Sequence, residues 1–166
     1  LSVDGLGGPV VFNVRDGYYN EQVTLPLISN SSHLNTITFQ SESLDAEAVE
    51  LAFQANGSEY FTIFLYGCSH VNFRHLSFSS LDPLFARVLV TSGAKNILID
   101  HCIFNGTTQE CADAESAVLI YTNFGGGSDN WIIRSNVFND ACMQVESYNA
   151  DNWLIENNDF NNALTY

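Results

Sequence analysis

The sequence predicts an all-β solenoid, a parallel β-helix of about five to six coils, because a repeat and a strand-like composition coincide. A twelve-residue pattern occurs four times, at 69–80, 95–106, 129–140 and 151–162, with start-to-start spacings of 26, 34 and 22 residues. Each copy alternates Ile, Val, Phe or Trp with polar residues and is bordered by Asn, Asp, Gly or Ser, as in short strands between turns. No copy can bury its apolar side alone, so the copies must stack on one another.

Aligned copies place like residues in columns, which a stack of parallel strands explains. Strands about 4.8 Å apart bring the same position of each copy together, so a Phe column becomes a stack of rings inside the coil. An Asn column, with His70 in the first copy, lies at a border where Asn suits a left-handed turn and each amide can bond the next. The predicted ladders are Phe78, Phe104, Phe138 and Phe160, and Asn96, Asn130 and Asn152.

Further strands are expected between the repeats and before them. The segments 62–67, 87–93, 117–123 and 143–149 precede the four copies and predict a second sheet in each coil. The segments 9–17, 21–26 and 35–41 predict one or two less regular coils near the start. Residues 43–55 have a helical composition, although their apolar residues alternate equally well as a strand.

Length and charge limit the architecture and the partners. Residues 1–166 are expected to form a single β-helix domain, and we interpret it as a segment of a larger secreted protein because it begins without Met and stops inside the repeated pattern. Five Lys and Arg stand against 19 Asp and Glu, a net charge of −14, which argues against nucleic acid and anionic membranes as partners. No apolar run is long enough to insert into a membrane. No cofactor is predicted, although the acidic composition leaves room for Ca²⁺ on clustered carboxylates.

Four blocks carry a resemblance to a known group of proteins. They are GGPVVFNVRDGYYNEQVTLP (7–26), NTITFQSES (35–43), VNFRHLSF (71–78) and ILIDHCIFNG (97–106). With its repeat, the chain resembles secreted bacterial β-helix proteins of the pectin-lyase-like superfamily. The resemblance implies a right-handed parallel β-helix that is one part of a large secreted or cell-surface protein. It implies no single activity, because that superfamily holds lyases, hydrolases, esterases and non-enzymatic adhesin or surface domains.

Two classes of function remain after these observations. The leading hypothesis is a non-catalytic module, structural or adhesin-like or carbohydrate-binding, whose partner is a polysaccharide or another protein domain of the same assembly. The alternative is part of a polysaccharide-active enzyme, a lyase or a glycoside hydrolase. A groove of aligned carboxylates with a basic residue would favour the enzyme, and a featureless or apolar outer face would favour the module.

One column of charged residues is the candidate for catalysis. Arg74, Asp100, Arg134 and Glu156 alternate in sign on adjacent copies, which predicts solvated ion pairs across the strands. A catalytic alternative uses Asp100 and His101, with Arg74 and Arg134 beside them. A hydrolase-like pair of acids is not formed, because both in-register neighbours of Asp100 are basic. We therefore predict a structural ladder and no catalytic residue.

The histidine and tryptophan columns are candidates for a zinc site and for a sugar-binding surface. His75 and His101 should stack, but His70 lies at the other end of its strand, so a zinc site is not expected. Strict alternation cannot bury both the Trp131 and Trp153 column and the adjacent apolar column. We expect Trp to face inward and the other column to lie on a face covered by an insertion or a neighbouring domain; the alternative is an exposed Trp platform for sugar rings. The second column consists of Leu98, Ile132 and Leu154.

The cysteines suggest one disulfide. Cys111 lies in the insertion at 106–117, and Cys142 follows its Phe at a comparable place on the next coil. In an oxidising compartment a Cys111–Cys142 bridge would pin that insertion to the solenoid. Cys102 belongs to a packed column, and Cys68 is predicted to lie in a turn.

Overall fold

A computed structural model of the chain describes residues 5–54, 60–82, 87–106, 118–122 and 126–163. The described residues contain strands and no α-helix, and the strands form three parallel sheets. Sheet A pairs β1 (Val10–Val14), β4 (Ile37–Ser41), β7 (Val71–Arg74), β10 (Leu98–Asp100), β13 (Ile132–Arg134) and β16 (Leu154–Glu156). Sheet B pairs β2 (Gly17–Asn20), β5 (Val49–Phe53), β8 (Ser77–Ser80), β11 (Ile103–Asn105), β14 (Val137–Ala141) and β17 (Asp159–Ala163). Sheet C pairs β3 (Val23–Leu25), β6 (Ile63–Tyr66), β9 (Leu89–Ser92), β12 (Val118–Thr122) and β15 (Met143–Glu146).

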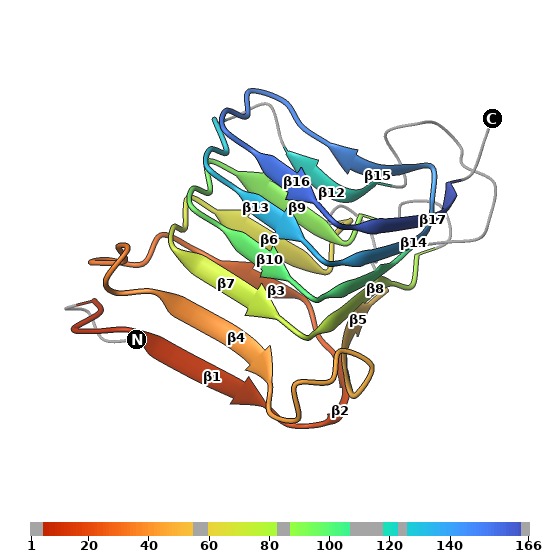
Figure 1. The fold of residues 1–166 in the computed structure, drawn as a ribbon, viewed down its shortest axis with the longest axis horizontal. Coiled ribbons are helices and arrows are strands. Elements are labelled where there is room, and N and C mark those ends of the chain that lie inside the picture. Colours follow the sequence, from red (N-terminus) through yellow and green to blue (C-terminus); the bar gives the residue numbers. More distant parts are fainter. Residues whose placement is uncertain (1–4, 55–59, 83–86, 107–117, 123–125, 164–166) are drawn as a thin grey trace.

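The chain visits the three sheets in turn and rises by one strand at each visit, so the predicted parallel β-helix is confirmed (Figure 1). Its coils are stacked from β1 at the lower end to β16 and β17 at the upper end, with the right-handed sense that parallel crossovers take. Sheets A and B each contain six strands and sheet C contains five among the described residues, which agrees with a prediction of five to six coils. Residues 43–55, with their helical composition, contribute strand β5 instead.

Each twelve-residue repeat forms two strands rather than one, which corrects the prediction of two sheets per coil. A residue in the left-handed conformation turns the chain from sheet A to sheet B in every copy, at His75, His101, Ser135 and Asn157, with φ between 51° and 55°. The next side chain points into the bend and is buried or nearly so. These side chains are Leu76, Cys102, Asn136 and Asn158.

Two of those bend residues form an internal amide ladder. Asn136 Nδ2 donates to the Ile99 carbonyl at 3.0 Å, and its Oδ1 accepts from the Cys102 amide at 2.8 Å. Asn158 repeats the arrangement one coil higher, donating to the Ile133 carbonyl at 2.8 Å. Backbone groups that the bend removes from the sheets are satisfied in this way, which buried polar groups require.

The core consists of the columns that the repeat predicts. Phe78, Phe104, Phe138 and Phe160 lie in register, with successive ring centroids 5.3, 5.0 and 5.0 Å apart. Beside them Ile99 and Ile133 are fully buried. The second left-handed corner, before sheet A, is formed by His70, Asn96, Asn130 and Asn152, with φ between 56° and 60°. Asn152 Nδ2 donates to Asn130 Oδ1 at 3.2 Å, as expected for an Asn column.

The cysteines differ in state. Cys68 and Cys102 are free and buried, and burial raises the pKa of each thiol to about 12. Cys142 is disulfide-bonded. Cys111 lies outside the described residues, so the Cys111–Cys142 bridge stays a prediction.

Candidate functional site

The outer face of sheet A carries two parallel rows of side chains. Ile99 and Ile133 point into the core, so by strand alternation the residues on either side of them point outward. The first row, which we call the apolar row, consists of Leu98, Ile132 and Leu154. The second, which we call the charged row, consists of Arg74, Asp100, Arg134 and Glu156.

Asp100 is the centre of the charged row. Arg134 of the next coil donates from Nε to Asp100 Oδ1 at 3.1 Å and from Nη2 to Oδ2 at 3.3 Å. His101 Nδ1 lies 2.9 Å from the same Oδ1, and Arg74 Nε of the preceding coil lies 3.9 Å from Oδ2. The ion pairs lie across the strands as predicted, but the row is not solvated throughout, because Asp100 is only 6% exposed.

The electrostatics of this cluster keep Asp100 ionised. Burial by itself raises the pKa of Asp100, but the hydrogen bonds from Arg134 and His101 and the Arg134 charge outweigh burial, so the pKa is lowered. Asp100 in turn raises the pKa of Arg134. A carboxylate with a lowered pKa and both oxygens bonded is a poor general base and carries no proton to donate at neutral pH. The structure therefore brings the four catalytic candidates together, and their bonds to Asp100 suit a structural role. These candidates are Asp100, His101, Arg74 and Arg134.

The histidines form a second part of this corner. His75 and His101 stack with ring centroids 5.0 Å apart, one coil above the other. The pKa of His75 is lowered by desolvation and by the His101 charge. His70 lies at the opposite corner of sheet A, beside Ser69. No group of three or more His, Cys, Asp or Glu able to hold a metal ion occurs among the described residues. The Ca²⁺ expectation stays untested.

A groove runs along the apolar row. It has a volume of about 570 Å³, its floor includes Leu98, Ile132 and Leu154, and one wall is the corner with Asn96 and Asn130. Ile132 is 37% and Leu154 is 47% exposed, so in the described part of the chain no segment covers this floor. The predicted covering insertion or domain stays a prediction.

The tryptophans lie inside, as expected from the alternation. Trp131 is fully buried and stacks on Trp153 with centroids 4.8 Å apart. Trp131 Nε1 donates to the Ala94 carbonyl at 2.9 Å, and Trp153 Nε1 donates to the Ser128 carbonyl at 2.6 Å. The indoles therefore support the corner from within, and the aliphatic row is the surface that faces outward.

Sheet B presents a feature that the sequence reasoning missed, an outer row of hydrogen-bonded amides. Asn161 donates to Asn139 at 3.1 Å, Asn139 donates to Asn105 at 2.9 Å, and Asn105 donates to Ser79 at 3.3 Å. The signal was present in the repeat, since these residues follow each Phe of the aligned copies.

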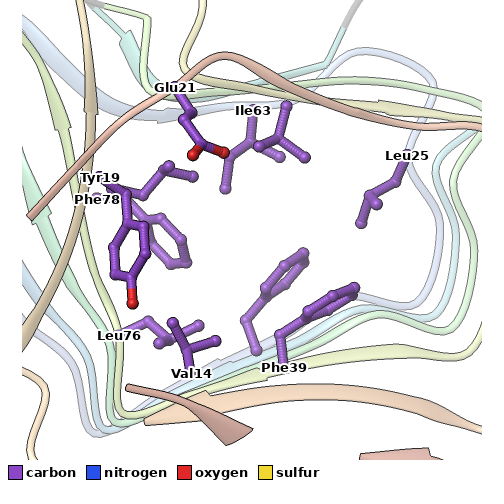
Figure 2. Close-up of a pocket in the computed structure, with 11 residues that line it drawn as sticks. Val14, Tyr19, Glu21, Leu25, Phe39, Ile63, Leu76 and Phe78 are labelled. Carbon is purple, nitrogen blue, oxygen red and sulfur yellow. The ribbon is translucent and has the colours of Figure 1, made fainter. Parts of the chain in front are cut away.

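A second cavity lies inside the solenoid at its lower end, between the three sheets (Figure 2). Its volume is about 310 Å³. Apolar side chains from the first three coils form most of its wall. They are Val14, Val23, Leu25, Phe39, Leu51, Ile63, Phe73, Leu76 and Phe78, joined by Tyr19 and Glu21.

Comparisons with known proteins add one structural relative. No protein-family model and no curated protein matches the chain. One solved structure that it resembles is the crystal structure of the pectin methylesterase from Aspergillus niger in a penultimately deglycosylated form, at 12% sequence identity and a TM-score of 0.34. The match covers 94% of this chain and 78% of the other. The chain is a parallel β-helix by its own strand pairing, and the enzyme's activity is not carried over to it. No helix in the described residues is long and apolar enough to cross a membrane.

Proposed function

We propose that this β-helix is a non-catalytic module that binds a neutral polysaccharide along the groove of sheet A. The observation that carries the proposal is the exposed apolar row, flanked by Asn side chains that recur on successive coils. A polymer with a short repeat can make the same contact on each coil, and coils are about 4.8 Å apart. Several weak contacts of one kind then add along the chain of sugars.

The two sides of the groove match the two kinds of surface that a sugar ring presents. Leu98, Ile132 and Leu154 offer aliphatic surface to the C–H face of a pyranose, and this contact removes apolar area from water. Asn96, Asn130 and Asn152 are exposed and offer amide donors and acceptors to hydroxyl groups. Asn152 uses one N–H on Asn130, which leaves most of the capacity of both amides for a ligand or water.

Charge favours a neutral ligand over an acidic one. The chain carries a net charge of −14, which repels polyanions. The charged row beside the groove alternates Arg74, Asp100, Arg134 and Glu156, so its own charges balance. The arginines are directed at Asp100, to which Arg134 donates two hydrogen bonds.

The same cluster is the observation that favours the second candidate, a polysaccharide-active enzyme. Asp100 lies between two arginines and beside His101, next to the groove, as the catalytic alternative requires. Its lowered pKa and occupied oxygens support the structural role instead. A secreted or cell-surface location, in a larger adhesin-like assembly, is part of this proposal and rests on the sequence resemblance and the acidic composition.

The test is binding and turnover measured on the same polysaccharides. We would screen a glycan array and measure affinity for soluble neutral and acidic polysaccharides, with and without Ca²⁺, beside reducing-end and unsaturated-uronate assays. Ile132→Thr and Leu154→Thr are expected to weaken binding about tenfold together, because each removes exposed apolar contact without disturbing the core.

The matched control is Val137→Thr, a similar change on the outer face of sheet B, which should leave binding unchanged. Binding that survives the sheet A changes would overturn the groove assignment. Turnover that Asp100→Asn abolishes would replace the binding module by the enzyme. If neither binding nor turnover were detected with any polysaccharide, the proposal would be contradicted, and a protein partner would be the remaining candidate for this face.

A further inference from the structure

The lumen of the solenoid is filled differently at its two ends. In the upper coils Phe104, Phe138 and Trp131 occupy the space between the sheets and are fully buried. In the lower coils the column of Phe104 and Phe138 continues through Phe78 to the shorter Leu51. The difference leaves the cavity of about 310 Å³ between β1 to β3 and the third coil.

The cavity is open to solvent at the lower end of the solenoid, because Val14, Val23 and Leu25 on its wall are half-exposed. Without an occupant its apolar wall lies against water, and an apolar occupant would remove that surface from water. An apolar cavity is also a poor place for water, because water needs polar partners there. The chemistry of the wall therefore favours an apolar ligand, and the volume lies at the small end of the range for ligand sites.

Glu21 makes the site specific. Figure 2 shows its carboxylate directed into the lumen, across from the rings of Phe39 and Phe78. The Glu21 side chain has no hydrogen-bond or ion-pair partner among the described residues, and its backbone N–H donates to the Ala52 carbonyl. Glu21 is solvent-exposed, so its charge stays hydrated while it faces an otherwise apolar wall. The Tyr19 hydroxyl donates to the Arg15 carbonyl at 2.8 Å and is already engaged.

We propose that this cavity binds a small amphipathic amine, with its apolar body among Phe39, Phe73 and Phe78 and its ammonium group beside Glu21. An ammonium group supplies the opposite charge and the donors that the carboxylate lacks within the protein. The aromatic rings pack the body and favour a nearby cation through their faces. A neutral ligand would fill the same space without using Glu21, and an anionic one would be repelled.

The experiment compares three probes of one shape by isothermal titration calorimetry at neutral pH. Phenylbutylamine is expected to bind with an affinity about tenfold above that of phenylbutanol, because its hydrogen bonds to the carboxylate are charge-assisted. Phenylbutyrate is expected not to bind. Glu21→Gln should lower the affinity for the amine to that for the alcohol, whereas Glu47→Gln, a change on the outer surface of sheet B, should have no effect.

Two cavity-filling variants show where the probe binds. Leu51→Phe and Leu25→Phe should each abolish binding of both the amine and the alcohol, while thermal unfolding reports whether each variant is folded. Two such variants are used because one of them can overpack. Equal affinity for amine and alcohol would overturn the role of Glu21. Absence of binding to the folded wild-type protein, or binding that persists in both folded filling variants, would overturn the site.

Discussion

Arg134 donates two hydrogen bonds to Asp100 of the preceding coil, from Nε to Oδ1 at 3.1 Å and from Nη2 to Oδ2 at 3.3 Å. The pair joins β13 to β10 on the outer face of sheet A, and Arg74 approaches the same carboxylate from β7. One buried acid therefore links three successive coils. Its loss would leave two guanidinium groups facing each other without the charge between them.

Asp100→Asn is expected to destabilise the protein by about 1–2 kcal/mol, the lower part of the range for charged hydrogen bonds, since the arginine side chains are partly exposed and solvent screens them. Urea unfolding followed by circular dichroism measures this change. The control is Asp129→Asn, which removes an exposed pair with Lys95 and should have a smaller effect. Equal effects of both changes would show that burial of Asp100 contributes nothing.

The same carboxylate predicts a pH dependence. The folded protein holds the pKa of Asp100 below its ordinary value, so the unfolded chain binds more protons as the pH falls. The stability from Asp100 is therefore complete above about pH 4 and is lost as the pH falls through the folded pKa. The difference in unfolding free energy between wild type and Asp100→Asn should shrink over that acidic range. A difference that stays constant with pH would contradict the lowered pKa.

The left-handed conformation at the bend between sheets A and B predicts which substitutions at Ser135 lower stability. Ser135 has a φ of 55°, and its side chain makes no hydrogen bond to any described residue, so a substitution there reports the backbone effect alone. Ser135→Val should cost about 1–2 kcal/mol because a β-branched residue is strained there, whereas Ser135→Asn and Ser135→Gly should be close to neutral. Thermal unfolding of the three variants measures the order. A neutral Val variant would mean that the bend can relax.

Removing an amide from the internal ladder should lower the free energy of unfolding more than removing one from the outer amide row. Asn136→Ala leaves the Cys102 amide without its partner, and removes a bond to the Ile99 carbonyl, in a site that is 1% exposed, at a cost of about 2–3 kcal/mol. Asn139→Ala on the outer amide row changes the same residue type on the same coil, and water replaces its bonds, so its cost should be under about 1 kcal/mol. Paired urea titrations give both values, and a reversed order would refute the distinction.

The thiols predict an alkylation pattern. Cys68 and Cys102 are buried with pKa values raised to about 12, so they should resist iodoacetamide in the native protein and react once urea unfolds it without reductant. Peptide mapping should then recover Cys111 and Cys142 joined, and both alkylatable only after reduction. Recovery of either as a free thiol in the unreduced, unfolded protein would remove the predicted bridge.

The sequence by itself determined the coil. The columns of Phe104 with Phe138 and of Ile99 with Ile133 follow from twelve-residue copies that cannot each bury an apolar side, and only stacked parallel strands place all the copies in register. The left-handed corner at Asn96 and Asn130 was equally readable, because Asn is the residue that tolerates it.

Only the tertiary structure decided how each copy divides and which charges are buried. Ser135 has no strong left-handed preference, so the bend that converts one predicted strand into two is imposed by the closing of the coil and by the amide of Asn136 inside it. Asp100 is an outward-facing acid in the sequence pattern, yet arginines from both neighbouring coils cover it. The lumen cavity, with Glu21 on its wall, depends on how side chains from three sheets meet, and no pattern along one strand contains that information.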